Sequence, residues 1–153
     1  FLKRAGLNMT NVSYRGNAPA LTDIVAGHLP TMFSNLSDAL PHIQSGAVRA
    51  LAVSSEARVA QLPNVPTVAE LGYPGFESNT WIGVFAPAGT PEDILQRINS
   101  EINKLLTSKS IAENFSSQSL EAVRMDRAAT EAYVSAEARK WGAVVKETGA
   151  RVD

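Results

Sequence analysis

The sequence contains no cysteine and only two histidines, His28 and His42. Without cysteine there are no disulfides, no thiolate nucleophiles and no thiolate metal sites. The histidines fall in different predicted elements and form neither an H-x-x-x-H pair nor a Cys/His cluster. We therefore expect both to be surface residues and predict no metal site.

Neither an excess of charge nor a long apolar run is present. The 14 Lys and Arg residues are balanced by 15 Asp and Glu residues, and no segment concentrates positive charge. A surface that follows a phosphate backbone needs such a concentration, so we expect no nucleic-acid partner. No apolar run approaches the roughly 20 residues of a spanning helix, which predicts no direct membrane insertion. The 153 residues, 44% of them hydrophobic, have the composition of a globular protein.

The common motifs of catalysis and cofactor binding are missing as well. The sequence has no G-x-S-x-G, no G-x-G-x-x-G and no G-x-x-x-x-G-K-[ST]. Several serines lie near the ends of predicted strands, but no residue pattern offers them a base. These are Ser34, Ser37, Ser54 and Ser55. We predict no catalytic residue and no cofactor.

The first third of the chain alternates between patterns of two periods. Helical periodicity over residues 18–26 and 36–43 separates β-prone segments at 8–14, 29–34 and 48–53. Gly27 and Gly46 are positioned to end the two helices. The βαβαβ order predicts an α/β fold with a parallel sheet covered by helices.

A segment rich in proline and glycine, residues 60–75, follows and contains one short helical turn at 67–71. In that turn Thr67 and Glu70 have the spacing of a capping box. This segment is the best candidate boundary between two structural units. The β-prone run at 79–86 comes next.

The last third is predicted to be mostly helical. One helix begins with Thr90 as N-cap and Pro91 in its first position, and another begins after Asp126 and ends at Gly149. Between them lie a helical piece at 111–116 and a strand candidate at 120–124. Each long helix has an apolar stripe that we expect to face the core: Ile94, Leu95, Ile98, Ile102, Leu105 and Leu106 in the first, and Ala129, Tyr133, Ala136, Lys140 or Trp141, Val144 and Val145 in the second.

The junction at residues 12–20 is the strongest candidate for a binding site. A strand passes through Gly16 into a helix whose first main-chain N–H groups have no partner within the helix. Such donors, aided by the helix dipole, favour an anion such as a carboxylate. The predicted ligand-binding residues of the junction are Tyr14, Gly16, Asn17, Ala18, Pro19 and Ala20. A local alternative stays open, in which Asn17 only caps the helix while Tyr14 and Pro19 pack nearby.

A second polar junction strengthens this hypothesis. Ser34, Asn35 and Ser37 follow the next predicted strand, so they are expected at the same carboxyl edge of the sheet, where open α/β folds bind ligands. We include Asn35 among the candidate ligand-binding residues. Arg15, beside the first turn, is a weaker candidate for pairing with an anion.

Four stretches of the sequence, in this order, resemble the successive signatures of one family: VSYRGNAPALTDIVAG (12–27), MFSNLSDALPHIQSG (32–46) with VRALAV (48–53), LPNVPTVAELG (62–72) and WIGVFAPAGTP (81–91). They are similar to those of the substrate-binding proteins of tripartite tricarboxylate transporters, the Bug-type extracytoplasmic solute receptors. The resemblance covers nearly the whole chain.

This resemblance implies a fold, a function and a location. The fold is a two-lobed, type II periplasmic-binding-protein-like α/β fold with parallel or mixed sheets, of which we expect this chain to be an incomplete part. Residues 1–78 would form most of the second, ligand-binding lobe, residues 79–86 the strand crossing between lobes, and residues 87–153 the completion of the first lobe. The function would be to capture a small carboxylate in the periplasm and deliver it to membrane transporter subunits.

Two other functions remain open at this point. One is the effector-binding domain of a regulator, because sensor domains use similar two-lobed folds. The other is a hydrolase that uses Ser34, Ser54 or Ser55, against which stands the lack of an acid/base pair.

Overall fold

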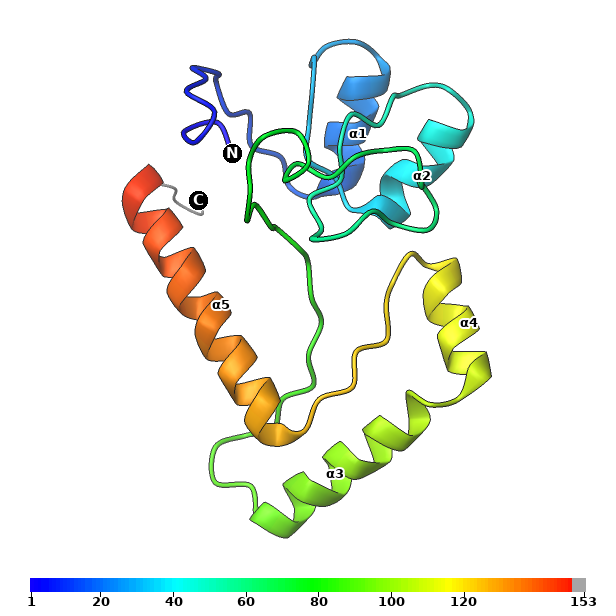
Figure 1. Ribbon diagram of the computed structural model, residues 1–153, viewed down its shortest axis with the longest axis vertical. Helices are drawn as coiled ribbons and strands as arrows, with labels where there is room; N and C mark the ends of the chain where they lie inside the picture. The colour runs from blue at the N-terminus through cyan, green and yellow to red at the C-terminus, as the bar shows by residue number, and fades with distance from the viewer. Residues whose placement is uncertain (150–153) are drawn as a thin grey trace. The chain divides into compact units, whose positions relative to one another are not determined.

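The computed structural model describes residues 1–149, in which five α-helices are connected by loops and extended segments (Figure 1). The helices are α1 (Asn17–Val25), α2 (Leu36–Gln44), α3 (Glu92–Leu105), α4 (Lys109–Ser117) and α5 (Arg127–Thr148). Every predicted helix is present, with small displacements of the ends. None of these helices combines the length and the apolar content that crossing a membrane requires.

The chain divides into two compact units. The α1/α2 unit consists of residues 13–85 and 116–120, and the α3/α5 unit consists of residues 1–12, 86–115 and those from 121 onward. The assignment of residues 1–78, 79–86 and 87–153 to lobes and a crossover strand stays a prediction.

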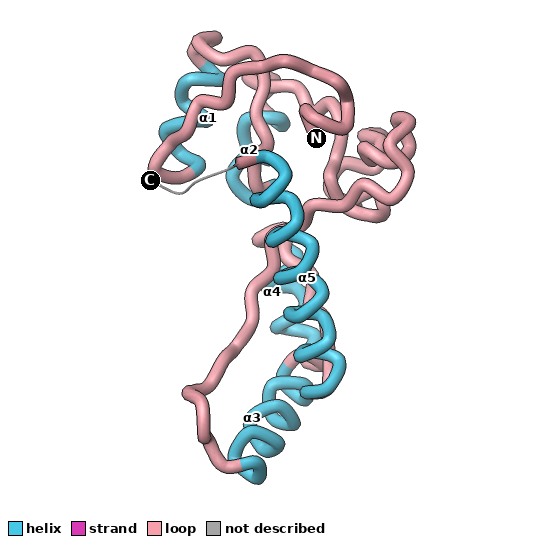
Figure 2. The backbone as a smooth tube through the Cα atoms, turned by 90° about the vertical axis from the view of Figure 1, so that its left-hand side faces the viewer, coloured by secondary structure: helices cyan, strands magenta, loops and turns pink. Residues whose placement is uncertain are grey.

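The β-prone segments of the α1/α2 unit are extended but do not build a sheet. Within residues 1–149 the β-type pairing is one isolated parallel bridge between Val53 and Thr67, and the segments between helices appear as loop in Figure 2. Val53 donates its N–H to the Pro66 carbonyl and accepts from the Val68 N–H, both at 2.9 Å. The two helices of the predicted βαβαβ order are thus present, but extended connections take the place of its strands. A helix closes its hydrogen bonds within one segment, whereas a strand needs a neighbour to supply them.

The core of the α1/α2 unit lies where α1 meets the residues around this bridge. Ala20, Leu21 and Val68 are at most 8% exposed, and Thr67 is 1% exposed. Helix α1 also contacts α2. Burial of the Ala20 and Leu21 side chains fixes which face of α1 points inward and therefore which face its first turn presents to solvent.

The capping box predicted at Thr67 is confirmed. The Thr67 hydroxyl accepts from the Glu70 N–H at 3.1 Å, and a Glu70 carboxylate oxygen accepts from the Thr67 N–H at 2.8 Å. That main-chain N–H and, second, the Arg58 guanidinium hold the pKa of Glu70 below its ordinary value. The reciprocal bonds close a single helical turn that would otherwise be too short to be stable.

Replacing Thr67 by valine should lower the free energy of unfolding by about 1 to 2 kcal/mol, because the part-buried Glu70 N–H loses its cap while the side-chain volume is kept. Thr67→Ser, which keeps the hydroxyl, should lose less. Urea denaturation followed by circular dichroism compares the two variants. Equal stability of Thr67→Val and the wild type would show that this bond contributes nothing.

In the α3/α5 unit, helix α3 begins one residue later than predicted. Pro91 is its N-cap and accepts the first helical bond from the Leu95 N–H at 3.1 Å. The Thr90 hydroxyl donates instead to the Pro87 carbonyl at 2.8 Å. Thr90 was therefore wrongly predicted as the cap, because the preceding turn already uses its side chain.

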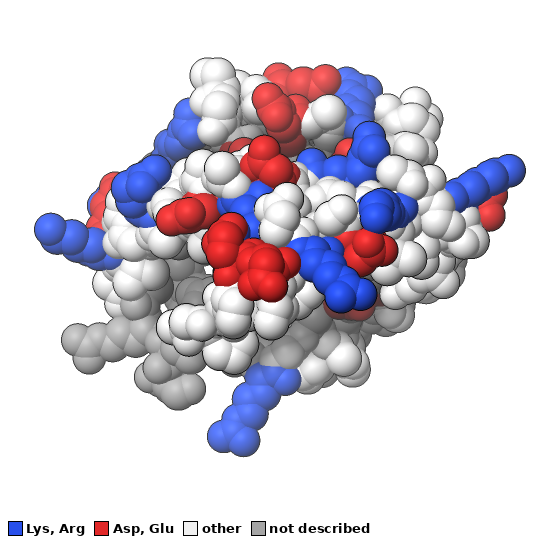
Figure 3. Space-filling view, turned by 90° about the horizontal axis from the view of Figure 1, so that it is seen from below, with Lys and Arg blue, Asp and Glu red and all other residues white. Residues whose placement is uncertain are grey.

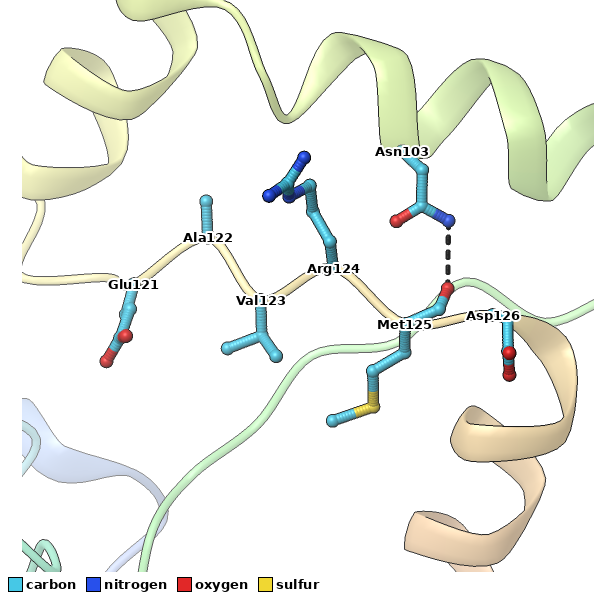
Figure 4. A pocket seen from close by; sticks show the side chains of 7 residues that line it. All are labelled: Asn103, Glu121, Ala122, Val123, Arg124, Met125 and Asp126. Carbon is cyan, nitrogen blue, oxygen red and sulfur yellow. Dashed lines mark hydrogen bonds between the residues drawn. The ribbon is translucent and has the colours of Figure 1, made fainter.

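The strand candidate at 120–124 is extended and attached to α3 by two amides. Asn99 and Asn103 of α3 donate to the Met125 carbonyl at 3.1 and 2.8 Å. Figure 4 shows the alternation typical of extended backbone, with Arg124 on the opposite side from Val123. Residues 121–126 and Asn103 line an open hollow, which contains none of the predicted ligand-binding residues.

Helix α5 has both predicted ends. Asp126 caps it by accepting from the Ala129 N–H at 2.7 Å, and Gly149 ends it in the left-handed conformation, with φ of 67°. The predicted apolar stripe of this helix is wrong in part, since Trp141 and Val145 are 40% and 49% exposed. The buried residue of α5 is Glu137.

Candidate functional site

The predicted junction lies at the start of α1, and Gly16 determines its shape. Gly16 is the N-cap of α1, with φ of 107° and ψ of 174°. This backbone conformation is essentially restricted to glycine. A Cβ atom at Gly16 would meet nothing within 4 Å, so the requirement for glycine is conformational and not one of space. The chain turns sharply here and delivers Asn17 and Ala18 as the first residues of the helix.

No side chain caps α1, and its first turn contains no acidic residue. Helices α2, α3 and α5 each have either an acidic residue in the first turn or a side-chain cap. The acidic residues are Asp38 in α2 and Glu92 and Asp93 in α3, and the cap is Asp126 in α5. The first turn of α1 therefore contains no acidic side chain that could accept from its free N–H groups or balance the positive end of its dipole.

Asn17 does not cap the helix, contrary to the local alternative left open by the sequence. Its side-chain amide donates to the Ser34 hydroxyl at 2.8 Å and to a carboxylate oxygen of Asp38 at 2.7 Å. Ser34 precedes α2, and Asp38 lies in its first turn. The Asn17 side chain thus holds the starts of α1 and α2 together and leaves the main-chain donors at the start of α1 uncapped.

Asn35 lies at the N-cap of α2, and its side chain does not cap that helix either. The side-chain oxygen of Asn35, Oδ1, accepts from the Thr80 hydroxyl at 3.0 Å. Because a hydroxyl donor occupies the oxygen, the orientation of the amide is fixed, and the NH₂ group is the part left to act toward a ligand. Asn17, Asn35 and Thr80 together join three segments of the α1/α2 unit by side-chain hydrogen bonds.

The remaining residues of the predicted junction have different environments. Ala18 and Pro19 are exposed, as is Arg15, whereas Ala20 is buried with Leu21. Pro19 lies within the first turn, where its missing N–H costs nothing. The N–H groups of Asn17, which is half-buried, and of Ala18, which is exposed, thus have no side-chain cap, whereas the side chain of Ala20 serves the core.

Tyr14 takes part in a network that the sequence analysis missed. Its hydroxyl donates to Asp23 Oδ2 at 2.5 Å, and His28 Nδ1 lies 3.1 Å from Asp23 Oδ1. The hydrogen bond to Asp23 raises the pKa of the Tyr14 phenol, helped by desolvation and the negative charge. The bonds from Tyr14 and then His28 lower the pKa of Asp23. No motif links these three positions, so only the folded chain could reveal them.

The serines considered as nucleophiles have structural partners. Ser34 donates to the Asn35 carbonyl at 3.1 Å, while Ser54 and Ser55 donate to the carbonyls of Ser78 and Ala57 at 2.7 Å each. His28 contacts Asp23 and not a serine. In the described part of the chain, no group of three or more His, Cys, Asp or Glu residues could hold a metal ion.

Both acidic and basic side chains occur on the face seen in Figure 3. Acidic and basic side chains lie side by side there, in keeping with the 14 basic and 15 acidic residues of the sequence. That face presents no broad surface of one sign.

Comparison with known proteins defines the class. The chain matches R. palustris Rpa4515, solved with adipate, at a TM-score of 0.84 and 32% identity over 97% of this chain and 50% of that one. It also matches the periplasmic binding protein BugD, at a TM-score of 0.79 and 30% identity over 97% and 50% of the two chains. The fold is therefore the two-lobed type II fold of periplasmic binding proteins, as predicted, with this chain corresponding to part of it.

Sequence comparison then defines the family. Residues 1–150 match the tripartite tricarboxylate transporter family receptors. Protein BugT of Bordetella pertussis is 38% identical over 152 residues, which are 99% of this chain and 47% of BugT. The chain belongs to the tripartite tricarboxylate transporter receptor family. It spans about half the length of the relatives it matches.

Proposed function

We propose that this chain forms the ligand-binding part of an extracytoplasmic receptor that captures a small carboxylate and passes it to the membrane subunits of a tripartite tricarboxylate transporter. The carboxylate would be held at the start of α1 by the main-chain N–H groups of Asn17 and Ala18. We call these two donors the carboxylate cradle. Asn35 would contribute its amide from the start of α2.

The observation that carries this proposal is the uncapped start of α1. Its first N–H groups have no side-chain cap, its turn requires Gly16, and the Asn17 side chain that could have capped it is bonded to Ser34 and Asp38. Hydrogen bonds from such donors to a charged acceptor contribute about 1.5 to 3 kcal/mol each. The helix dipole adds about 0.3 to 1 kcal/mol at an exposed site.

The family supports the same ligand class and location. A related receptor was solved with adipate, and BugD is a periplasmic binding protein. We therefore place the protein in the periplasm and assign it binding without catalysis. The bonds of Ser34, Ser54 and Ser55 to main-chain carbonyls agree with this assignment, since none of these hydroxyls is paired with a base.

Calorimetric titration of the full gene product with succinate, adipate, citrate and acetate tests the proposal. At least one of these carboxylates should bind with a stoichiometry near one and raise the melting temperature with concentration, as expected for a ligand that binds only the folded state. The corresponding amides, succinamide and adipamide, are the matched uncharged controls and should bind far more weakly. A well-folded protein that binds none of the carboxylates would contradict the proposal, as would turnover of ester substrates without carboxylate binding.

A further inference from the structure

Asp23, in the last turn of α1, joins the segments that precede and follow this helix. One oxygen of its carboxylate accepts from the Tyr14 hydroxyl, and the other lies 3.1 Å from His28 Nδ1. Its main-chain carbonyl accepts from the His28 N–H at 2.8 Å and from the Leu29 N–H at 3.4 Å. Tyr14 precedes the helix and His28 follows it, so a single residue anchors both connections.

The bond from Tyr14 has a direct effect on the turn at Gly16. The hydroxyl of a residue that precedes the helix reaches Asp23 in its last turn, so the segment before Gly16 is held back along α1. Asp23 thus fixes the position of Tyr14 on one side of the Gly16 turn, while Asn17 is fixed on the other side by Ser34 and Asp38. The turn between them has little freedom to move.

The bond also decides what Tyr14 can offer to a ligand. A phenol has one O–H to donate, and here it is donated to a carboxylate, the type of acceptor that gives short and strong hydrogen bonds. The raised pKa of Tyr14 and the lowered pKa of Asp23 agree with a neutral phenol beside a charged carboxylate. Tyr14, predicted from the sequence as a ligand-binding residue, therefore has no proton left for a bound anion.

We infer that Asp23 is a positioning residue of the carboxylate cradle, acting through the hydroxyl of Tyr14, and that His28 holds the second oxygen of Asp23 in place. The inference rests on the proposed function, because it assigns these residues to the same binding site. Neither Asp23 nor His28 touches the ligand; they keep the donors of Asn17 and Ala18 in position before the ligand arrives.

A double-mutant cycle in the full gene product tests this inference, with succinate, adipate, citrate and acetate as probes. Tyr14→Phe and Asp23→Ala should each weaken binding of whichever probe binds the wild type by about tenfold, the equivalent of one hydrogen bond. If Asp23 acts through Tyr14, the double variant should lose no more than either single variant. Asp23→Asn, which keeps an acceptor of the same size, should recover part of the affinity. Asp93→Ala, an exposed acid of α3, is the matched control and should bind as the wild type does.

Tyr14 also supplies a readout that requires no ligand. The difference in ultraviolet absorbance between the wild type and Tyr14→Phe isolates the ionisation of this phenol from that of the other tyrosines. The phenol should ionise at a clearly lower pH in Asp23→Ala than in the wild type, whereas Asp93→Ala should leave its titration unchanged. A change in helix stability alone would not produce this shift.

The possible failures are distinguishable. If the wild type binds none of succinate, adipate, citrate and acetate, the proposed function and this inference fall together. If the wild type binds but the Tyr14 and Asp23 variants bind equally well, the inference alone is wrong. Fully additive losses in the double variant, or an unchanged Tyr14 titration in Asp23→Ala, would also overturn it.

Discussion

Replacing Gly16 by alanine should weaken carboxylate binding at least tenfold. Gly16 has φ of 107° and ψ of 174°, a conformation that costs a residue with a Cβ about 1 to 3 kcal/mol. Nothing surrounds the missing Cβ, so the chain can relieve the strain by returning φ to negative values. That relaxation would redirect the backbone between Tyr14 and Asn17 and displace the donors of the cradle. A tenfold loss of affinity corresponds to about 1.4 kcal/mol.

Gly27→Ala is the matched control for this prediction. Gly27 follows the other end of α1, has φ of 77° and also has open space around its missing Cβ. Both alanine variants should therefore lower the stability of the protein, but only Gly16→Ala should lose affinity. Calorimetric titration with the carboxylate that binds the wild type measures the difference. Equal affinities of the two variants would place the ligand away from the start of α1.

The helices of this chain were predictable because their signals are local. The left-handed glycine after α1, the Asp126 cap and Gly149 at the two ends of α5, and the Thr67 capping box all occur where the sequence indicated them. Each of these signals works through bonds between residues a few positions apart. The misplaced start of α3 shows the limit, since Thr90 had a competing acceptor in the Pro87 carbonyl.

The strands were not predictable in the same way. The segment at 79–86 has the strongest β propensity of the sequence, yet Ile82, Val84 and Phe85 are 81%, 71% and 67% exposed. β propensity describes how well a side chain fits a sheet that already exists, and says nothing about where the neighbouring strand comes from. Within residues 1–149 only Val53 and Thr67 form a bridge. Trp81, in the same run, is likewise 37% exposed, and its ring lies 6.4 Å from that of Phe85.

The sequence predicted the backbone features of the candidate site but not the contacts of its side chains. The glycine turn, the proline in the first turn and the helix start follow from residue types in order. The partners of Asn17, which are Ser34 and Asp38, and the contact of Tyr14 with Asp23 join positions whose separation follows no local rule. These contacts depend on how α1 packs on α2 and on how the chain folds back along α1, and both are set by tertiary structure. The assignment of these residues to a ligand remains our proposal.

Replacing Glu137 by alanine should lower the free energy of unfolding by about 2 kcal/mol, which is large for a glutamate in a long helix. Glu137 is 9% exposed, and its carboxylate accepts from Trp141 Nε1 and from Lys140 Nζ, each at 2.9 Å. Hydrogen bonds to a charged acceptor contribute about 1.5 to 3 kcal/mol, and removing the acceptor leaves its donors unsatisfied. The Lys140 side chain is 35% exposed and Trp141 is 40% exposed, so water compensates both donors in part, and the expected loss lies near the lower end of this range.

Glu131→Ala, an exposed acid of the same helix, is the matched control and should change stability by less than about 0.5 kcal/mol. Glu137→Gln keeps an oxygen that can accept from the indole N–H and should lose less than Glu137→Ala. Urea denaturation followed by tryptophan fluorescence distinguishes the three variants, because Trp141 reports on its own environment. Similar losses for Glu137→Ala and Glu131→Ala would mean that the buried carboxylate stabilises α5 no more than an exposed one does. A larger loss for Glu137→Ala would show that the side chain that α5 buries to stabilise the protein is a charged one, outside the apolar stripe predicted from the sequence.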